Sequence, residues 1–209
     1  MTEHEKQKNE TTMLPLVEEF YTLQGEGYHA GKAAYFIRLG GCDIGCSWCD
    51  SRFSWNPDLH PLVSADDITE HAMNTGTDSV VVTGGEPMIW NLDYLCNSLK
   101  KNNLSTFVET SGGYPLSGKW DWICLSPKRN MPPNEEICKK ANELKVIISE
   151  AKDFEWAEEY RKRVSPLCKL YLQPEWSQFN KIIPDIVEYI KKKPEWRVSL
   201  QIHKYMHIP

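Results

Sequence analysis

The chain has 209 residues, a length that suits one compact domain with a sizeable core. Hydrophobic residues make up 41% and charged residues 25%, as is typical of a soluble globular protein. The net charge is −5 and no Lys/Arg run stands out, so we expect no nucleic-acid partner. No apolar run reaches the ~18 residues of a membrane span, and residues 1–12 lack an apolar signal core. We therefore expect a cytoplasmic protein without a membrane partner, with a disordered tail over residues 1–12 and one domain over residues 13–209.

Short apolar runs, several of them rich in β-branched residues, alternate with helix-like segments after the polar tail. In chain order, strands are expected at residues 34–39, 79–83, 105–109, 122–125, 144–148, 169–172 and 197–202. The first helix is expected to start at Ser64, an N-cap residue, with Asp67 in its first turn; the others are expected at residues 92–101, 154–163 and 182–192. This alternation predicts an α/β fold, with a parallel sheet and helices outside it.

Five of the expected strands end in polar or glycine-rich residues. The segments are Thr83-Gly84-Gly85-Glu86-Pro87, Glu109-Thr110-Ser111-Gly112, Ser126-Pro127-Lys128, Gln173-Pro174 and Gln201-Ile202-His203. In α/β barrels the carboxyl ends of the strands carry the chemistry, although any strand must also end in a turn. Because 209 residues are too few for a closed eightfold barrel of about 250 residues, we expect a partial, open TIM-like β/α barrel.

Three of the seven cysteines form the pattern C-x3-C-x2-C at Cys42, Cys46 and Cys49. In a reducing compartment such a cluster favours metal over disulfides, and thiolates suit both zinc and iron–sulfur clusters. Structural zinc takes four protein ligands, and the nearest histidine downstream, His60, stands alone. Three cysteines on a four-iron cubane leave one iron open, which predicts a [4Fe–4S] cluster that binds a further ligand. The other cysteines are expected in the core: Cys96, Cys124, Cys138 and Cys168.

The cysteine spacing, with Trp48 before the last cysteine, resembles that of the radical S-adenosylmethionine (SAM) superfamily. The segment Gly84-Gly85-Glu86-Pro87 strengthens the resemblance, because the second motif of that superfamily brings backbone groups against the methionine of SAM. Without the cysteines, the same segment would indicate only a strand-to-helix turn. The resemblance implies that the open iron binds SAM and that electron transfer cleaves SAM to a 5′-deoxyadenosyl radical.

Three further features resemble the 7-carboxy-7-deazaguanine synthase family. They are residues 20–27, Arg38 on the first expected strand, and residues 201–209 at the C-terminus. The resemblance extends from about Val17 to the last residue. It implies a carbon–nitrogen lyase that converts 6-carboxy-5,6,7,8-tetrahydropterin to 7-carboxy-7-deazaguanine with loss of ammonia, on the 7-deazapurine pathway to queuosine. It also implies that SAM is regenerated and that Mg²⁺ assists.

The resemblance carries roles over to matching positions one by one. The residues it implies for substrate binding are Leu23, Gln24, Gly25, Glu26, Arg38, Thr83, His203 and Pro209. Amide and carboxylate groups suit a flat heterocycle rich in donors and acceptors, and a guanidinium suits the substrate carboxylate. Arg38 is equally compatible with an exposed strand-end charge, and His203 with a hydrogen-bonded core histidine. In the family, a C-terminal proline such as Pro209 meets the substrate through its free carboxylate.

A second set of positions is implied to bind the cofactor. These are Trp48, Cys49, Asp50, Gly84, Gly85, Glu86, Thr110, Ser111, Ser126, Lys128 and Gln173. Ordinary strand-end polarity would also account for several of them. Ser51 stands where relatives often carry threonine as a Mg²⁺ ligand, and a hydroxyl oxygen suits this hard cation. Glu175 and Trp176 depart from the family pattern, in which smaller polar residues are expected.

The resemblance further implies a flavodoxin- or ferredoxin-type electron donor and a homodimer. Three other hypotheses remain open. An activase of anaerobic ribonucleotide reductase shares the size and the cysteine spacing but needs neither residues 20–27 nor this C-terminus. A non-enzymatic iron–sulfur redox protein would need a fourth ligand and would not need the Gly-Gly-Glu-Pro segment. The third is a zinc-binding interaction module, and the number of available ligands weighs against it.

Overall fold

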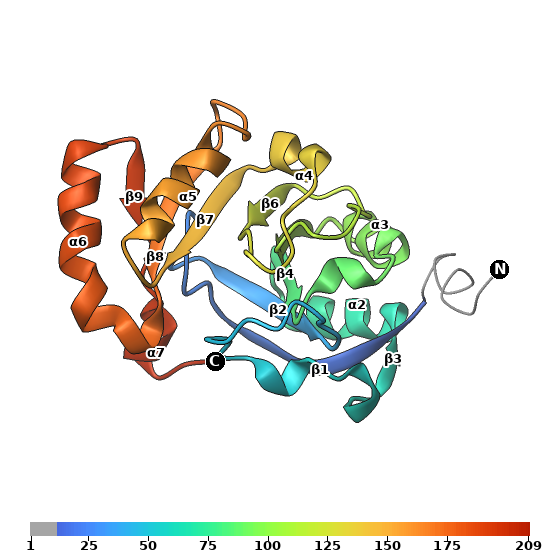
Figure 1. The fold of residues 1–209 in the computed structure, drawn as a ribbon. Helices are drawn as coiled ribbons and strands as arrows, with labels where there is room; N and C mark the ends of the chain where they lie inside the picture. Colours follow the sequence, from blue (N-terminus) through green and yellow to red (C-terminus); the bar gives the residue numbers. More distant parts are fainter. Residues whose placement is uncertain (1–11) are drawn as a thin grey trace.

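The computed structural model describes residues 12–209, so residues 1–11 of the expected tail lie outside the described residues. A nine-stranded sheet has the order β3-β1-β2-β4-β5-β6-β7-β8-β9. From β2 to β9 neighbouring strands are parallel, whereas β1 pairs antiparallel with both β2 and β3. The strands are β1 (Met13–Leu23), β2 (Ala33–Leu39), β3 (Leu62–Ser64), β4 (Ser79–Gly84), β5 (Ser105–Thr110), β6 (Trp122–Leu125), β7 (Glu143–Ile148), β8 (Lys169–Pro174) and β9 (Trp196–Val198). The sheet curves but does not close, which confirms the expected open barrel (Figure 1).

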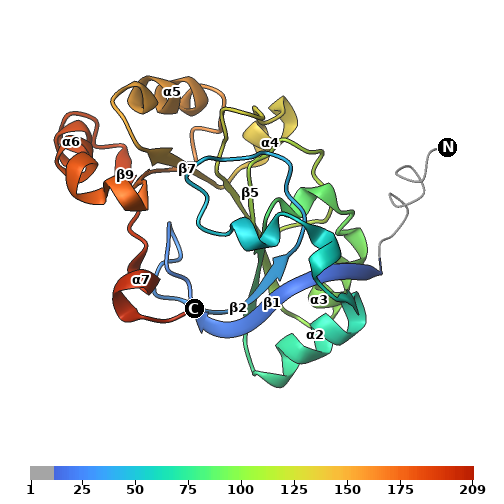
Figure 2. The same ribbon diagram turned by 60° about the horizontal axis from the view of Figure 1, so that its bottom comes forward.

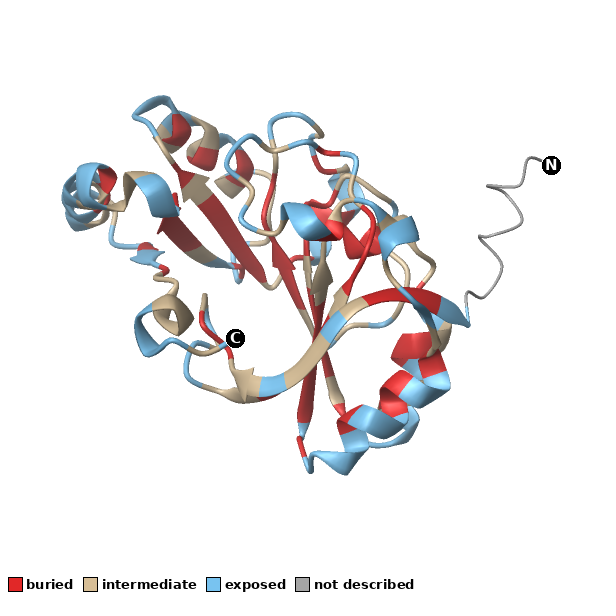
Figure 3. Cartoon of the chain, turned by 90° about the horizontal axis from the view of Figure 1, so that it is seen from below, coloured by how far each residue is buried: buried red, intermediate tan, exposed pale blue. Residues whose placement is uncertain are grey.

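Helices cover the convex side of the sheet (Figure 1). They are α2 (Ala65–Asn74), α3 (Asp93–Lys101), α4 (Glu135–Lys140), α5 (Lys152–Arg161) and α6 (Phe179–Lys192), with a short α7 (Ile202–Met206) near the C-terminus. Ser64 caps α2, as expected, by accepting a 3.0 Å hydrogen bond from Asp67 N. The helix sides toward the sheet are buried and the opposite sides are exposed (Figure 3). No helix in residues 12–209 is long and apolar enough to span a membrane.

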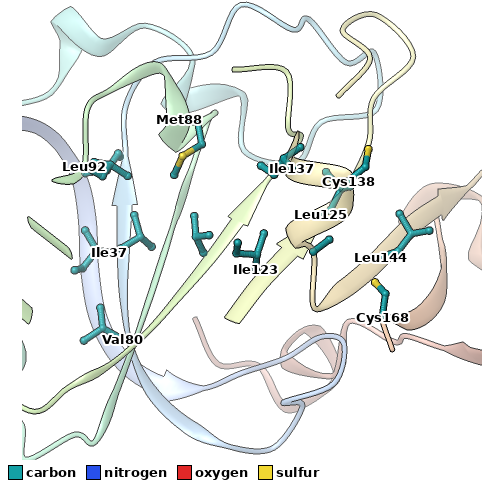
Figure 4. Packing of buried hydrophobic residues seen from close by; sticks show 14 of the residues in the cluster. Ile37, Val80, Met88, Leu92, Ile123, Leu125, Ile137, Cys138, Leu144 and Cys168 are labelled. Carbon is teal, nitrogen blue, oxygen red and sulfur yellow. The ribbon is translucent and has the colours of Figure 1, made fainter. Parts of the chain in front are cut away.

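Side chains of the parallel strands alternate between two environments, because successive residues of a strand point to opposite faces. Outward-facing Ile37, Val80 and Leu144 join the main core against the helices (Figure 4). Inward-facing Phe36 and Val81 form a small apolar layer inside the barrel. All four scattered cysteines are buried, which confirms their expected core placement. The inner face beyond the small apolar layer is left for polar side chains.

The strand expected at residues 197–202 is wrong in its bounds. The observed β9 is Trp196–Val198, and Ile202 already begins α7. Trp196 is buried and fixes the strand one residue earlier. The hydroxyl of Ser199 donates to Gln173 Oε1 at 2.7 Å, and the chain then leaves the sheet. Within residues 12–209, two strands and two α-helices had no counterpart in the sequence prediction: β1, β3, α4 and α7.

Replacing Leu144 with alanine should destabilise the domain by about 2–5 kcal/mol, because its fully buried side chain leaves a cavity between β7 and the helices. Leu167→Ala is the matched control, since Leu167 is 84% exposed and its loss should cost no more than about 0.5 kcal/mol. Anaerobic urea unfolding measures both free energies. Equal midpoints for the two variants would contradict this packing.

Candidate active site

A cavity of about 490 Å³ lies inside the barrel at the carboxyl ends of the parallel strands, within the roughly 300–1,000 Å³ typical of small-molecule sites. Every residue that the sequence analysis assigned to a site lines it: Leu23, Gln24, Gly25, Glu26, Arg38, Cys42, Cys46, Trp48, Cys49, Asp50, Ser51, Thr83, Gly84, Gly85, Glu86, Thr110, Ser111, Ser126, Lys128, Gln173, His203 and Pro209. The lining residues that sequence reasoning did not assign include Ile44, Trp55, Glu109, Lys145, Ile147, Trp176 and Gln201. The expected residues therefore share one site.

The three clustered cysteines are free, half-buried thiols on the cavity wall. Their loop is held from outside: Asn130 Nδ2 donates to Ile44 O at 3.0 Å, and the Tyr114 hydroxyl donates to Asp43. Within residues 12–209, no three His, Cys, Asp or Glu side chains are grouped to hold a single metal ion. A cubane makes a different demand, because each cysteine binds its own iron. Three accessible thiols of one loop on one cavity fit such a cluster.

The two glycines after β4 pack against the start of the cysteine loop. A Cβ on Gly84 would lie 2.1 Å from Leu39 O, and Gly84 has a φ of +149°. A Cβ on Gly85 would lie 2.4 Å from Gly41 O and 2.7 Å from Cys42 Cβ. The glycines are therefore required for contact between two protein backbones, whether or not they also approach SAM.

Glu86 joins the ends of two neighbouring strands. Its carboxylate, in a residue only 1% exposed, accepts hydrogen bonds from Met88 N, Thr110 Oγ1, and the backbone and hydroxyl of Ser111, at 2.5–3.0 Å. Both oxygens are therefore engaged within the protein. This set of contacts fixes the rim between β4 and β5, and a direct contact of Glu86 with SAM stays a prediction.

Lys128 brings a positive charge to the cysteine side of the cavity. Its ammonium donates to Ser126 O at 2.8 Å and to Ser126 Oγ at 2.7 Å, and lies 5.5 Å from the Trp48 ring centre. Burial lowers the pKa of Lys128, and the nearby Cys46 opposes this effect. A cation beside thiolate ligands partly offsets their charge, which favours an anionic cluster at this place.

Lys145 projects into the barrel from β7, with a side chain only 4% exposed. Its ammonium lies 2.5 Å from Glu26 Oε2 and 3.5 Å from Glu109 Oε2. Burial disfavours its charge, but the carboxylates of Glu109 and Glu26 outweigh burial and raise the pKa of Lys145 well above its usual range. Burial also opposes the charge of Glu26, yet Lys145 lowers the pKa of Glu26 to about 2. Gln24 Nε2 donates to Glu109 Oε1 at 3.0 Å, so Gln24 and Glu26 belong to one charged network.

The C-terminal segment reaches the cysteine loop and the charged network together. Gln201 Nε2 donates to Glu26 Oε1 at 2.9 Å, and Lys204 Nζ donates to Asp50 Oδ2 at 2.8 Å. Burial opposes the charge of Asp50, but the hydrogen bond from Lys204 prevails and lowers the pKa of Asp50. Asp50 is therefore held by α7 at the position next to Cys49.

The last residues also pack against the loop that connects β1 and β2, beside the end of β1 (Figure 2). Ile202 N donates to Gly25 O at 2.9 Å. A Cβ on Gly25 would lie 2.1 Å from His203 Nδ1, so this contact requires glycine. Burial lowers the pKa of the half-buried His203, which favours a neutral imidazole. Pro209 follows on the cavity wall.

Arg38, Ser51 and Thr83 also line the cavity. Arg38 Nε donates to Glu18 Oε1 at 2.6 Å, so this arginine is an ion-pair partner of β1 as well as a wall residue. Ser51 Oγ lies 3.6 Å from Cys49 Sγ, beside the cluster loop. Each of the three presents a polar side chain to the cavity.

On β8, Gln173 is buried and its carbonyl oxygen is taken by the hydroxyl of Ser199. Glu175 caps the following 3-10 turn, because its carboxylate accepts hydrogen bonds from Ser177 N and Gln178 N. Trp176 lines the cavity and its ring centre lies 4.7 Å from Lys204 Nζ. Glu175 and Trp176, which the sequence analysis did not assign to a site, therefore both belong to this side of the cavity.

Comparison with known proteins agrees with the geometry. The model of the radical SAM superfamily matches residues 36–125. The 7-carboxy-7-deazaguanine synthases of Flavobacterium psychrophilum and Synechocystis sp. are 54% and 46% identical, and the matches cover 94% and 95% of this chain and 93% and 95% of theirs. The crystal structure of QueE from Escherichia coli superposes with a TM-score of 0.81 at 30% identity, covering 95% of this chain and 98% of that one.

An open parallel barrel with three cysteines of one loop on its cavity defines a radical SAM enzyme, a class that works with a [4Fe–4S] cluster and SAM. The relatives carry the assignment further, because the similarity runs over nearly the whole chain. The chain belongs to the 7-carboxy-7-deazaguanine synthase family, whose members are lyases.

Replacing any one of Cys42, Cys46 and Cys49 with alanine should abolish cluster retention and reductive cleavage of SAM, because each thiolate would bind a different iron. Cys138→Ala and Cys168→Ala are controls, since both residues are buried in the main core between the sheet and the helices. Iron and sulfide content and the visible spectrum of anaerobically purified protein measure the cluster without turnover. Loss of the cluster in either control would point to a fourth cysteine ligand and would contradict the open iron.

Proposed function

We propose that this protein converts 6-carboxy-5,6,7,8-tetrahydropterin to 7-carboxy-7-deazaguanine with loss of ammonia, in the biosynthesis of queuosine. The observation that carries the proposal is a single cavity with two chemically distinct walls. Three free thiols beside Gly85 line one wall, and the hydrogen-bonded network around Glu26 lines the other. A radical generated at the first wall would act on a polar heterocycle held at the second.

The cysteine wall would hold the cluster and SAM. Cys42, Cys46 and Cys49 are the cluster ligands in this proposal. When bound, the cluster and SAM supply the radical that starts the reaction. The residues proposed to contact SAM are Trp48, Cys49, Asp50, Gly84, Gly85, Glu86, Thr110, Ser111, Ser126, Lys128 and Gln173. For Glu86, the role would be to hold Thr110 and Ser111 at the rim, since its own oxygens are engaged.

The opposite wall would bind the pterin. The proposed substrate-binding residues are Leu23, Gln24, Gly25, Glu26, Arg38, Thr83, His203 and Pro209. Glu26 stays ionised beside Lys145, so it can accept hydrogen bonds from ring N–H groups. Arg38 supplies a planar cation for the substrate carboxylate. The neutral imidazole of His203 adds a donor and an acceptor at the C-terminal side.

Four further parts of the proposal follow the family. Mg²⁺ would bind near Ser51, with the substrate carboxylate supplying additional hard oxygen ligands. A flavodoxin- or ferredoxin-type protein would deliver the electron. The protein would act as a homodimer, and in the cytoplasm.

The direct test is anaerobic turnover of reconstituted protein with the carboxylated tetrahydropterin, SAM and a reductant. The expected result is 7-carboxy-7-deazaguanine and ammonia in equal amounts, with SAM not consumed in proportion. Cleavage of SAM without any deazaguanine product would overturn the proposed substrate while leaving the radical SAM class intact.

Arg38→Ala should weaken substrate binding by roughly 2–5 kcal/mol, because a desolvated carboxylate would lose its charged partner. Uncoupled cleavage of SAM without substrate reports separately on the cluster. Glu18→Gln is the matched control: it breaks the 2.6 Å ion pair with Arg38 but leaves the guanidinium in place. Equal substrate affinity in Arg38→Ala and the wild type would contradict a role in substrate binding and leave Arg38 only its ion pair with Glu18 of β1.

Ser51→Ala should reduce turnover and blunt its response to added Mg²⁺, because the variant lacks a hydroxyl oxygen on the cavity wall. Ser47→Ala serves as the control, since Ser47 is an exposed serine of the same loop. Rates with titrated Mg²⁺ and with chelator measure the effect. A wild-type rate indifferent to both additions would argue against the metal site.

A further inference from the structure

Glu143 lies on the inner face of β7, one inward step below Lys145, and is only 2% exposed. One of its oxygens, Oε2, accepts hydrogen bonds from Trp122 Nε1 at 3.0 Å and from Tyr28 N at 3.2 Å. The other oxygen, Oε1, is buried and has no hydrogen-bond partner among residues 12–209. Burying a carboxylate oxygen without a hydrogen-bond partner costs free energy, so we expect a further donor, such as a water molecule, at this oxygen.

His29 presents a second buried atom of this kind. Its Nε2 has no hydrogen-bond partner within the described part of the chain. The ring is clamped, stacked on Phe107 with centres 4.6 Å apart and edge-on to Trp122 at 4.6 Å. His29 as a whole is only half-buried, so part of the residue reaches solvent at the floor of the barrel while Nε2 is buried.

His29 and Glu143 line the same small cavity, of about 10 Å³, beneath the active site. That size is at the lower limit for one water molecule, roughly 10–15 Å³, and such a water needs two or more polar partners. Gln24, Glu26 and Glu109 line both this cavity and the large one above it. These three residues therefore form the partition between the small cavity and the substrate end of the active site.

We propose that this small cavity binds one water molecule between His29 and Glu143, and that the two residues and the water form a route for protons from the barrel floor to the active site. His29 is the outer end of the route. Glu143 and the water are its middle, and the route reaches the large cavity through the partition that Gln24, Glu26 and Glu109 form, with Glu26 remaining ionised. The kinetic part of this inference rests on the proposed function, whereas the water site does not.

The proposed reaction gives this route a purpose. Converting the tetrahydropterin to the deazaguanine releases one nitrogen and three hydrogens, which balance as ammonia. If the nitrogen leaves as ammonium, one proton must be taken up from solvent in each turnover. Substrate and SAM would fill the large cavity, so a path through the floor lets that proton enter without opening the mouth of the site.

The electrostatics of the two residues agree with such a role. Burial raises the pKa of Glu143, so this carboxyl can hold a proton more readily than an exposed one. Burial and the nearby Lys32 lower the pKa of His29, which favours a neutral ring that can accept a proton at one nitrogen and release it from the other.

The first test is a high-resolution crystal structure of the full chain with its cluster. The expected result is density for one water within hydrogen-bonding distance of both His29 Nε2 and Glu143 Oε1. An empty cavity, or direct contact between these two atoms, would overturn the proposal without any bearing on the substrate.

The second test uses Glu143→Gln and His29→Phe in the reconstituted enzyme. Glu143→Gln retains an oxygen that can accept from Trp122 and Tyr28, and His29→Phe retains the ring stacked on Phe107. Neither new side chain can take up and release a proton. We expect kcat to fall at least about tenfold in each, less than the ~10²–10⁴-fold typical of a group that exchanges protons with substrate itself. We expect KM to stay near the wild-type value and the solvent deuterium isotope effect on kcat to rise, since proton delivery becomes limiting.

Glu158→Gln is the matched control, because Glu158 also accepts from a tryptophan, Trp196 Nε1 at 2.9 Å, but lies on the outer helix α5. Its kcat should equal that of the wild type. An unchanged kcat in both test variants, or a lower kcat with an unchanged isotope effect, would overturn the proton route. If the wild type itself does not turn over the pterin, the proposed function fails, and the crystallographic water still decides whether the site exists.

Discussion

The backbone of Gly85 runs directly against the backbone that leads into Cys42, and the rest of the site is built outward from this contact. Gly85 N donates to Leu39 O and Glu86 N donates to Gly41 O, so the pairing of β2 with β4 continues past the ends of both strands. The first cysteine thereby starts from a fixed point on the rim. Because there is no room for a Cβ at Gly85, any side chain there would displace Cys42 and the loop that follows it. The carboxylate of Glu86 then extends the same rigid contact to β5.

The interior of the barrel departs from ordinary core packing at one place, where Lys145 lies between Glu26 and Glu109. Burying such charges is costly, and a well-packed apolar set is often as stable. Removing a single partner is worse still, at roughly 3–5 kcal/mol, because it leaves an uncompensated buried charge. The network is therefore not explained by a gain in folding stability. What it does achieve is to hold a loop from the edge of β1 across the barrel, with Glu26 ionised on the cavity wall.

The parallel strands were predictable because their middle residues are apolar and buried on both faces, as Val80, Val81 and Val82 of β4 are, and polar residues enter mainly toward the cavity. Strand β1 was not, because Glu18 and Glu19 interrupt its pattern; they pair with Arg38 and His71, which lie elsewhere in the chain. The site residues were predictable as strand ends and motifs, which meet on one rim in any such barrel. Lys145 could have been noticed as a charge within an apolar run, but which carboxylates surround it depends on the barrel's curvature and on where residues 24–26 fold back.

The C-terminal segment explains why the two walls of the cavity depend on each other. Gln201 contacts Glu26 on the wall that carries the charged network, and three residues later Lys204 contacts Asp50 on the cysteine wall. Gln201 directly precedes α7 and Lys204 lies within it, so the position of this short segment sets the distance between the two walls. A radical reaction needs its reacting atoms held close and in a defined orientation. Placing one element in contact with both walls satisfies that need, since a shift of α7 that loosened one wall would loosen the other as well.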